Sequence, residues 1–97
     1  MANILNSKIN SIEQRLSFAL EDRRDYWNRC KVEKRKRGRM TKLADAHFER
    51  FEEENDRIYK LIRELRNLGV DRSLSVEETE AYDWAAYGRY GLCRKIQ

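Results

Sequence analysis

The residues with the clearest chemical potential are the cations of the stretch RCKVEKRKRGRMTK, which runs from residue 29 to residue 42. Eight Lys or Arg residues stand there against one acid, Glu33, so the stretch carries +7 although the whole chain carries only +4. Such side chains bind phosphates or carboxylates by charge, and contact with a phosphate backbone needs no base-specific group. The candidate contact residues are Lys31, Lys34, Arg35, Lys36, Arg37, Arg39 and Lys42.

Three interpretations of this basic stretch stay open. It is a solvated turn kept soluble by like charges, a surface for nucleic-acid phosphates, or a docking surface for an acidic protein. The KRKR run at residues 34–37 also fits the loose pattern of a nuclear-localisation patch. Aromatic residues, which would support the stacking of single-stranded bases, are absent within the stretch; Tyr26 and Trp27 lie just before it.

A second group of candidates lies in AYDWAAYGRYG, residues 81–91, where aromatic side chains are concentrated around one arginine. Tyr, Trp and Arg dominate protein–protein binding energy because each combines a large contact area with a polar group. A protein-binding surface and a packed helix are equally compatible with the spacing, since Ala81, Trp84, Ala85 and Gly88 share one helical face. The candidate partner-contact residues are Tyr82, Trp84, Tyr87, Arg89 and Tyr90.

Catalytic and metal-binding patterns are missing. The only histidine, His47, has no recognisable catalytic partner, and none of the four glycines stands in a phosphate-binding loop. Cys30 and Cys93 form no CxxC pair, and no ExxH pattern accompanies the acidic residues that come after the basic stretch. The chain is therefore predicted to be non-enzymatic, with no catalytic residue, no metal site and no cofactor.

The elements that position these groups are predicted by the spacing of the apolar residues. Steps of three and four residues predict a helix of about 30 residues starting near residue 7, where Asn6, Ser7 or Ser11 offers a cap. A second, more regular stripe predicts a coiled-coil-like helix of about 28 residues with one polar seam position, Asn55. The first stripe is Leu5, Ile9, Ile12, Leu16, Ala19, Leu20, Trp27 and Cys30, and the second is Ala44, Phe48, Phe51, Asn55, Ile58, Ile62 and Leu65.

Turn and cap residues divide the chain. Gly38 and Thr41 predict a reversal between the two helices, Gly69 predicts the end of the second, and Ser75 with Glu78 predicts the capping box of a third. The prediction is an all-α fold: a long antiparallel hairpin over residues 1–70 with its basic turn near 29–42, then a short helix and an aromatic-rich tail over 71–97. One uninterrupted helix through Gly38 is the alternative, because an exposed glycine costs only about 1 kcal/mol.

The expected function depends on these surfaces. A two-helix hairpin buries little area, so its seams are expected to meet a second copy or a partner, giving a homodimer or a hetero-complex. In general style the chain resembles the small accessory proteins of bacteriophages and plasmids, and this resemblance implies a helical adaptor or inhibitor that binds a host protein, such as a nucleic-acid-processing enzyme. The alternative is a dimeric, largely sequence-nonspecific nucleic-acid-binding protein. No apolar run suits a membrane span, and a cytoplasmic location is expected.

Overall fold

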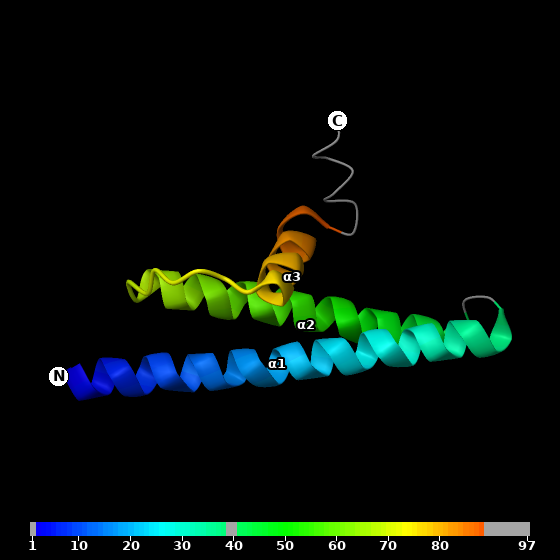
Figure 1. Cartoon of the computed structure of the whole chain (residues 1–97), viewed down its shortest axis with the longest axis horizontal. Coiled ribbons are helices and arrows are strands. Elements are labelled where there is room, and N and C mark those ends of the chain that lie inside the picture. Colours follow the sequence, from blue (N-terminus) through cyan, green and yellow to red (C-terminus); the bar gives the residue numbers. More distant parts are fainter. Residues whose placement is uncertain (1, 39–40, 89–97) are drawn as a thin grey trace.

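The computed structural model of the chain describes residues 2–38 and 41–88, without the side chains of residues 2, 3 and 37. Within these ranges the chain forms three helices and no strand: α1 (Ala2–Arg37), α2 (Lys42–Asn67) and α3 (Val76–Tyr87). Helices α1 and α2 lie side by side and antiparallel, and α3 crosses α2 at a steep angle (Figure 1). The predicted hairpin with a short third helix is confirmed, and the chain does not form one continuous helix.

The reversal between α1 and α2 takes place where the sequence predicts it. Gly38 follows the last residue of α1 with a φ of +71°, a left-handed conformation that a residue with a Cβ rarely adopts. Thr41 is the N-cap of α2, and its Oγ1 accepts a hydrogen bond of 3.1 Å from the backbone N–H of Ala44. The glycine and the cap together stop one helix and start the next within four residues.

The end of α2 and the start of α3 also have the cap structures that the sequence predicts. Gly69, at a φ of +86°, donates its backbone N–H to Arg66 O, and Val70 donates to Leu65 O, both at 3.0 Å. This pair of bonds is the Schellman arrangement that satisfies the last carbonyls of a helix. Ser75 and Glu78 form the predicted capping box at the start of α3. The connecting segment therefore has both of its ends fixed by local chemistry.

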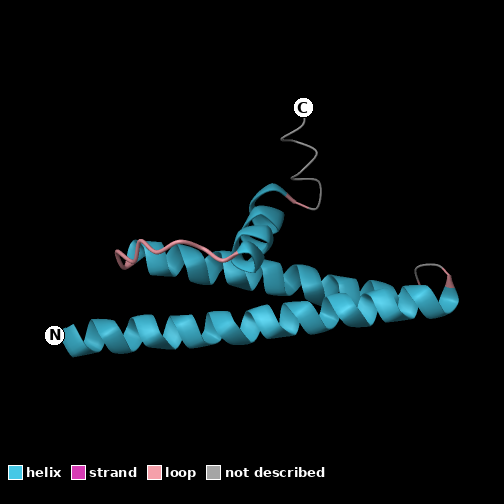
Figure 2. Cartoon of the chain, viewed as in Figure 1, coloured by secondary structure: helices cyan, strands magenta, loops and turns pink. Residues whose placement is uncertain are grey.

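The predicted start of α1 near residue 7 is wrong, because the helix already begins at Ala2 and is 36 residues long. Ser11 lies inside the helix and does not cap it, and its Oγ accepts a bond of 3.2 Å from Nη2 of Arg15. With only 26 residues in α2, the N-terminal end of α1 projects past the end of that helix (Figure 2). Ile4 is 75% exposed and Leu5 is 43% exposed there.

The core lies along the seam between α1 and α2 and extends under α3. Ile12 and Leu16 of α1 are buried against Ile58 and Ile62 of α2, and Ala81 of α3 completes the same cluster. Each of these side chains is no more than 2% exposed. Most of the predicted seam positions are thus buried against each other inside one chain, but Leu5 and Trp27 of the predicted α1 seam are exposed.

A polar layer interrupts this seam. Nε of Arg23 in α1 donates a hydrogen bond of 2.6 Å to Oδ1 of Asn55 in α2, and the guanidinium lies 4.9 Å from the ring centroid of Phe51. Burial lowers the pKa of Arg23, an effect that the nearby carboxylates of Glu80 and Glu77 partly offset. Because Asn55 is completely buried, a slipped register would leave Arg23 without this acceptor. The layer therefore fixes how the two helices are aligned.

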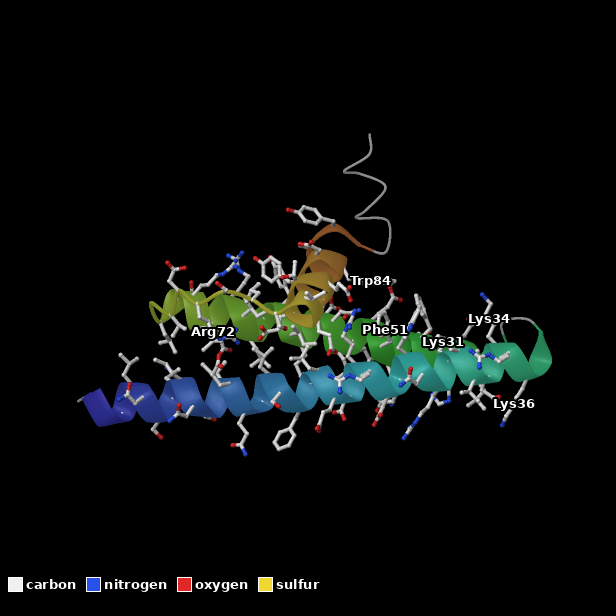
Figure 3. The ribbon with its side chains drawn as sticks, viewed as in Figure 1. Lys31, Lys34, Lys36, Phe51, Arg72 and Trp84 are labelled. Carbon is white, nitrogen blue, oxygen red and sulfur yellow. The ribbon has the colours of Figure 1, made fainter. Side chains whose placement is uncertain are left out.

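Arg72 attaches α3 to the hairpin. This residue lies in the segment that returns along α2 (Figure 3), and its two terminal nitrogens donate to both carboxylate oxygens of Glu78, at 2.7 and 3.0 Å. Its Nε donates to Oε1 of Glu13 in α1 at 3.0 Å. No sequence pattern indicates this role, because Arg72 stands in an irregular segment without periodicity. One arginine thereby connects α1, the connecting segment and the start of α3.

Candidate functional site

The basic stretch forms the tip of the hairpin. Its cations within the described residues occupy the last turns of α1 and the first position of α2. Lys31, Lys34, Arg35, Lys36 and Lys42 are all exposed. The side chain of Arg37 and the whole of Arg39, which belong to the same predicted set, lie outside the described part of the chain. Five of the seven predicted contact residues are thus brought together at one end of the molecule.

None of these five cations forms an ion pair with another described residue. The six ion pairs among residues 2–38 and 41–88 join residues between Glu13 and Glu80, and none includes a residue of the stretch 29–42. The acid within the stretch, Glu33, is half-buried and makes no ion pair in these ranges either. The positive charge of the tip is therefore not neutralised within the described chain, in contrast to that of the middle.

The cations surround the tip and do not form a flat patch. Lys34 and Lys36 project to opposite sides of α1 (Figure 3), as expected for two positions separated by about 200° of helical rotation. Cations at the C-terminal end of α1 also complement the partial negative charge of the helix dipole, an effect of about 0.3–1 kcal/mol each. This helix-end effect applies to the cations in the last turn of α1 and gives no reason for charge on Lys31 or Lys42.

The aromatic residues of the C-terminal segment divide into packed and exposed members. The ring of Trp84 lies 5.1 Å from Phe51 and 6.1 Å from Phe48, and its Nε1 donates to Glu52 at 3.5 Å. Tyr87 is 47% exposed and is the described member of the predicted partner-contact set that remains open to solvent. Arg89 and Tyr90 lie outside the described residues.

Tyr82, another predicted partner contact, packs on α2. Its ring lies 4.7 Å from that of Tyr59, and the guanidinium of Arg66 lies 5.1 Å from the centroid of Tyr82. Arg66 also donates to the Tyr82 hydroxyl at 3.5 Å. The interactions of Tyr82 and Trp84 within the chain hold α3 on α2, which is the packing alternative that the sequence left open for this segment.

Trp27, a predicted seam residue, lies partly at the surface. Its ring packs at 4.9 Å from Phe51, yet 37% of the residue remains exposed. The helical position explains this: Trp27 lies beside Arg23 and Cys30 on the border of the buried face of α1, not at its centre. The sequence could have identified Trp27 as a candidate site residue, because it lies four residues before Lys31 and therefore on nearly the same face of the helix.

Groups that could support other chemistry are few in the described ranges. They contain no cluster of three or more His, Cys, Asp or Glu residues arranged to hold a metal ion. Cys30 is buried and forms no disulfide among the described residues, and burial raises the pKa of its thiol. His47 is half-buried on α2. None of the helices in residues 2–38 and 41–88 combines the length and the apolar character needed to cross a bilayer.

No protein family, no curated protein and no solved structure matches the chain.

Proposed function

We propose that this chain is a non-enzymatic, cytoplasmic protein that binds nucleic acid through the tip of its helical hairpin, with little preference for sequence. The observation that supports the proposal is the set of exposed cations at the tip, Lys31, Lys34, Arg35, Lys36 and Lys42, which make no ion pair among the described residues. Other cations of the molecule, such as Arg24 and Arg72, pair with carboxylates of α3.

The physical basis is the release of counterions from a phosphate backbone. A cation without an internal carboxylate partner has no ion pair to break when a phosphate approaches, so its contact is gained at little internal cost. The arrangement of the cations around the end of α1 suits contact with a flexible or irregular backbone. Phosphate contacts carry no sequence information, so affinity is expected to depend on charge and hardly on sequence.

An adaptor or inhibitor function is the second candidate, and one observation favours it. Val76 is 76% exposed at the start of α3 and Tyr87 is 47% exposed at its end, and a spacing of eleven residues puts both on the outer face of this helix. A protein partner docked on this face would leave the tip available, as expected for a modulator of a nucleic-acid-processing enzyme. Tyr87→Ala is expected to abolish such binding, measured by pull-down of a purified partner.

Homodimerisation is predicted from the sequence because the seams of an isolated hairpin need a partner. The seams of α1 and α2 bury each other within one chain, so the hairpin itself removes that reason over the length of the core. A second copy is still a prediction for the surfaces outside the seam. Sedimentation at micromolar concentration measures it directly, and a stable monomer would contradict it.

The proposed nucleic-acid function is tested with a tip variant and a charge-matched control. The tip variant replaces Lys31, Lys34, Arg35 and Lys36 by Gln. The control replaces Lys8, Arg15, Lys60 and Arg63 by Gln, four exposed cations that also make no ion pair in the described ranges but lie away from the tip. Affinity for labelled DNA of random sequence is measured by fluorescence anisotropy over a range of salt concentrations.

The wild-type affinity is expected to fall steeply with salt. The tip variant should lower the slope of log affinity against log salt by about one for each lost phosphate contact, and the control should leave that slope close to wild type. Equal losses of DNA affinity in the tip variant and the control would contradict a role for the tip and indicate a general effect of net charge. Absence of salt-dependent binding by the wild-type protein would contradict the proposed function itself.

A further inference from the structure

An exposed tryptophan lies at the base of the charged tip. Trp27 is held from one side by Phe51, whose ring also contacts Phe48 at 5.9 Å and Trp84 at 5.1 Å. The indole therefore packs directly on α2, and α3 reaches it only through the contact between Trp84 and Phe51. The residue as a whole remains 37% exposed. Trp27 is thus an aromatic residue that is packed on one side by Phe51 and is partly accessible to solvent.

Two cations of the tip continue from this ring along the same side of α1. Lys31 and Lys34 come four and seven residues after Trp27, which places them about 6 and 10.5 Å further along the helix axis on nearly the same face. Both are exposed and unpaired in the described chain. Trp27, Lys31 and Lys34 together form a Trp–Lys face.

The charges on the other side of Trp27 differ in kind. Arg24, one turn before Trp27, is held by Glu77 of α3 at 2.6 Å, so this cation and this acid neutralise each other. Glu52 accepts the Trp84 N–H at 3.5 Å and keeps a negative charge near the aromatic cluster. The positive potential beside Trp27 therefore increases toward Lys31 and the tip and decreases toward α3.

We propose that the Trp–Lys face binds single-stranded nucleic acid, with one base stacked on Trp27 and the adjoining phosphates contacting Lys31 and Lys34. The proposal rests on the proposed function and specifies its ligand. A base in a duplex has both faces covered by its neighbours, so Trp27 stacks only on a base that a single strand leaves open. Charge alone would favour the duplex, whose phosphates are more closely spaced along its axis. The aromatic ring is what favours the single strand.

The first test uses the fluorescence of Trp27. The chain has two tryptophans, so Trp84→Phe leaves Trp27 as the only indole and keeps an aromatic ring at position 84. Titration of this variant with a short oligothymidine should quench its emission, because stacking brings the base against the indole. Duplex DNA of equal charge concentration should bind with little quenching. Equal quenching by both, or by neither while both bind, would overturn the inference.

The second test measures affinity for the same single strand and duplex. Trp27→Leu should weaken oligothymidine binding by about 5- to 150-fold, the range for loss of one stacked base, and should change duplex binding by less than about twofold. Trp27→Phe should recover most of the loss because it retains a ring. Phe18→Leu is the matched control: Phe18 is 57% exposed on the same helix, far from the tip, and its loss should change neither affinity.

The outcomes separate the inference from the proposed function. If Trp27→Leu binds both forms as the wild type does, the stacking role is overturned, while the salt-dependent role of the tip remains. If the wild type binds neither form, both proposals are overturned. If polyglutamate binds to the Trp–Lys face as tightly as oligothymidine and competes with it, the face is a site for an acidic protein and the inference is wrong. Should Trp27→Leu lose its helical circular dichroism, the quenching experiment and Trp27→Phe decide.

Discussion

The middle and the tip of this molecule use the same cationic residue types in opposite ways. In the middle, Arg24 and Arg72 are held by carboxylates of α3, and Arg23 is buried with an amide acceptor across the seam. At the tip, Lys31 and Lys34 extend into solvent and make no ion pair among the described residues. The difference does not come from the cations themselves.

The position of α3 accounts for the difference. This helix carries Glu77, Glu78 and Glu80, and each of them lies within 4 Å of an arginine of α1 or of the connecting segment. It crosses the hairpin near its middle and does not extend to the tip (Figure 1). Helix α3 thus supplies carboxylates that hold Arg24 and Arg72, whereas none of its carboxylates reaches a described cation of the tip.

The largest expected contrast is between apolar substitutions in the two regions. Ile58→Ala removes a completely buried side chain of the seam and should lower the free energy of unfolding by about 3 kcal/mol, because the cavity adds to the lost burial. Val32→Ala, at a position 48% exposed near the tip, should change it by less than about 0.5 kcal/mol. Urea unfolding followed by circular dichroism measures both. Similar losses would contradict the view that the tip is outside the core.

Removal of one arginine from each region should give the next contrast. Arg72→Met leaves the buried carboxylate of Glu78 without its two-pronged partner and should cost roughly 2 kcal/mol, the scale of hydrogen bonds to charged groups. Arg35→Met at the tip removes no ion pair with a described residue and should be neutral to within about 0.5 kcal/mol. Thermal melts of the two variants measure this difference. If Arg72→Met left the stability unchanged, the docking of α3 would not depend on the hydrogen bonds from Arg72 to Glu78 and Glu13.

The pH dependence of stability should also originate in the middle. Hydrogen bonds from Arg72 hold the pKa of Glu78 below its ordinary value of 4.5, despite the opposing effect of burial. A lowered pKa means that the stabilisation is present above pH 4.5 and is lost as the pH falls from there through the lower, folded-state pKa. Glu78→Gln should remove this acid loss, measured by urea midpoints across the acid range. If Glu78→Gln had the same pH profile of urea midpoints as the wild type, the loss of stability in acid would come from another group.

The pKa of Glu54, in the same region, is shifted in the opposite direction from that of Glu78, so its effect on the pH dependence of stability has the opposite sign. Burial raises the pKa of this carboxyl, and Arg57 only partly opposes the effect. Ionisation of Glu54 at neutral pH therefore costs stability, which returns as the pH falls through its raised folded-state pKa. Glu54→Gln should increase the urea midpoint at neutral pH and remove this gain. A lower urea midpoint for Glu54→Gln at neutral pH would mean that the ion pair between Glu54 and Arg57 outweighs the cost of burying the charge.

The smallest expected effect is on the stability of the tip variant used for the binding test. Replacing Lys31, Lys34, Arg35 and Lys36 by Gln removes repulsion among like charges but also removes cations that favour the end of α1. These effects oppose each other, so the free energy of unfolding should change by less than about 0.5 kcal/mol. A melt that matches wild type, combined with lost binding, would separate the function of the tip from the stability of the middle.

Features that depend on neighbouring residues are readable from the amino-acid sequence alone. Thr41, Gly69 with Val70, and Ser75 with Glu78 each form the cap predicted from the local pattern, because the bonds of a cap join residues two to five positions apart. The seam of α2 is likewise buried where its spacing predicts, except at Phe48, which is half-buried. The start of α1 could not be placed this way, since Ser7 and Ser11 are acceptable inside an exposed helix and do not require it to begin there.

The docking position of α3 and the contacts that it makes possible depend on the three-dimensional fold. The hydrogen bond from Arg72 to Glu13 joins residues that are 59 positions apart in the sequence. The packing of Trp84 on Phe51 joins α3 to the hairpin. No spacing rule predicts such contacts, because they depend on the direction in which the connecting segment returns along α2. The same holds for the candidate site: the sequence located the cations of the tip, but whether a cation such as Arg24 has a partner on α3 depends on the distance between the two helices.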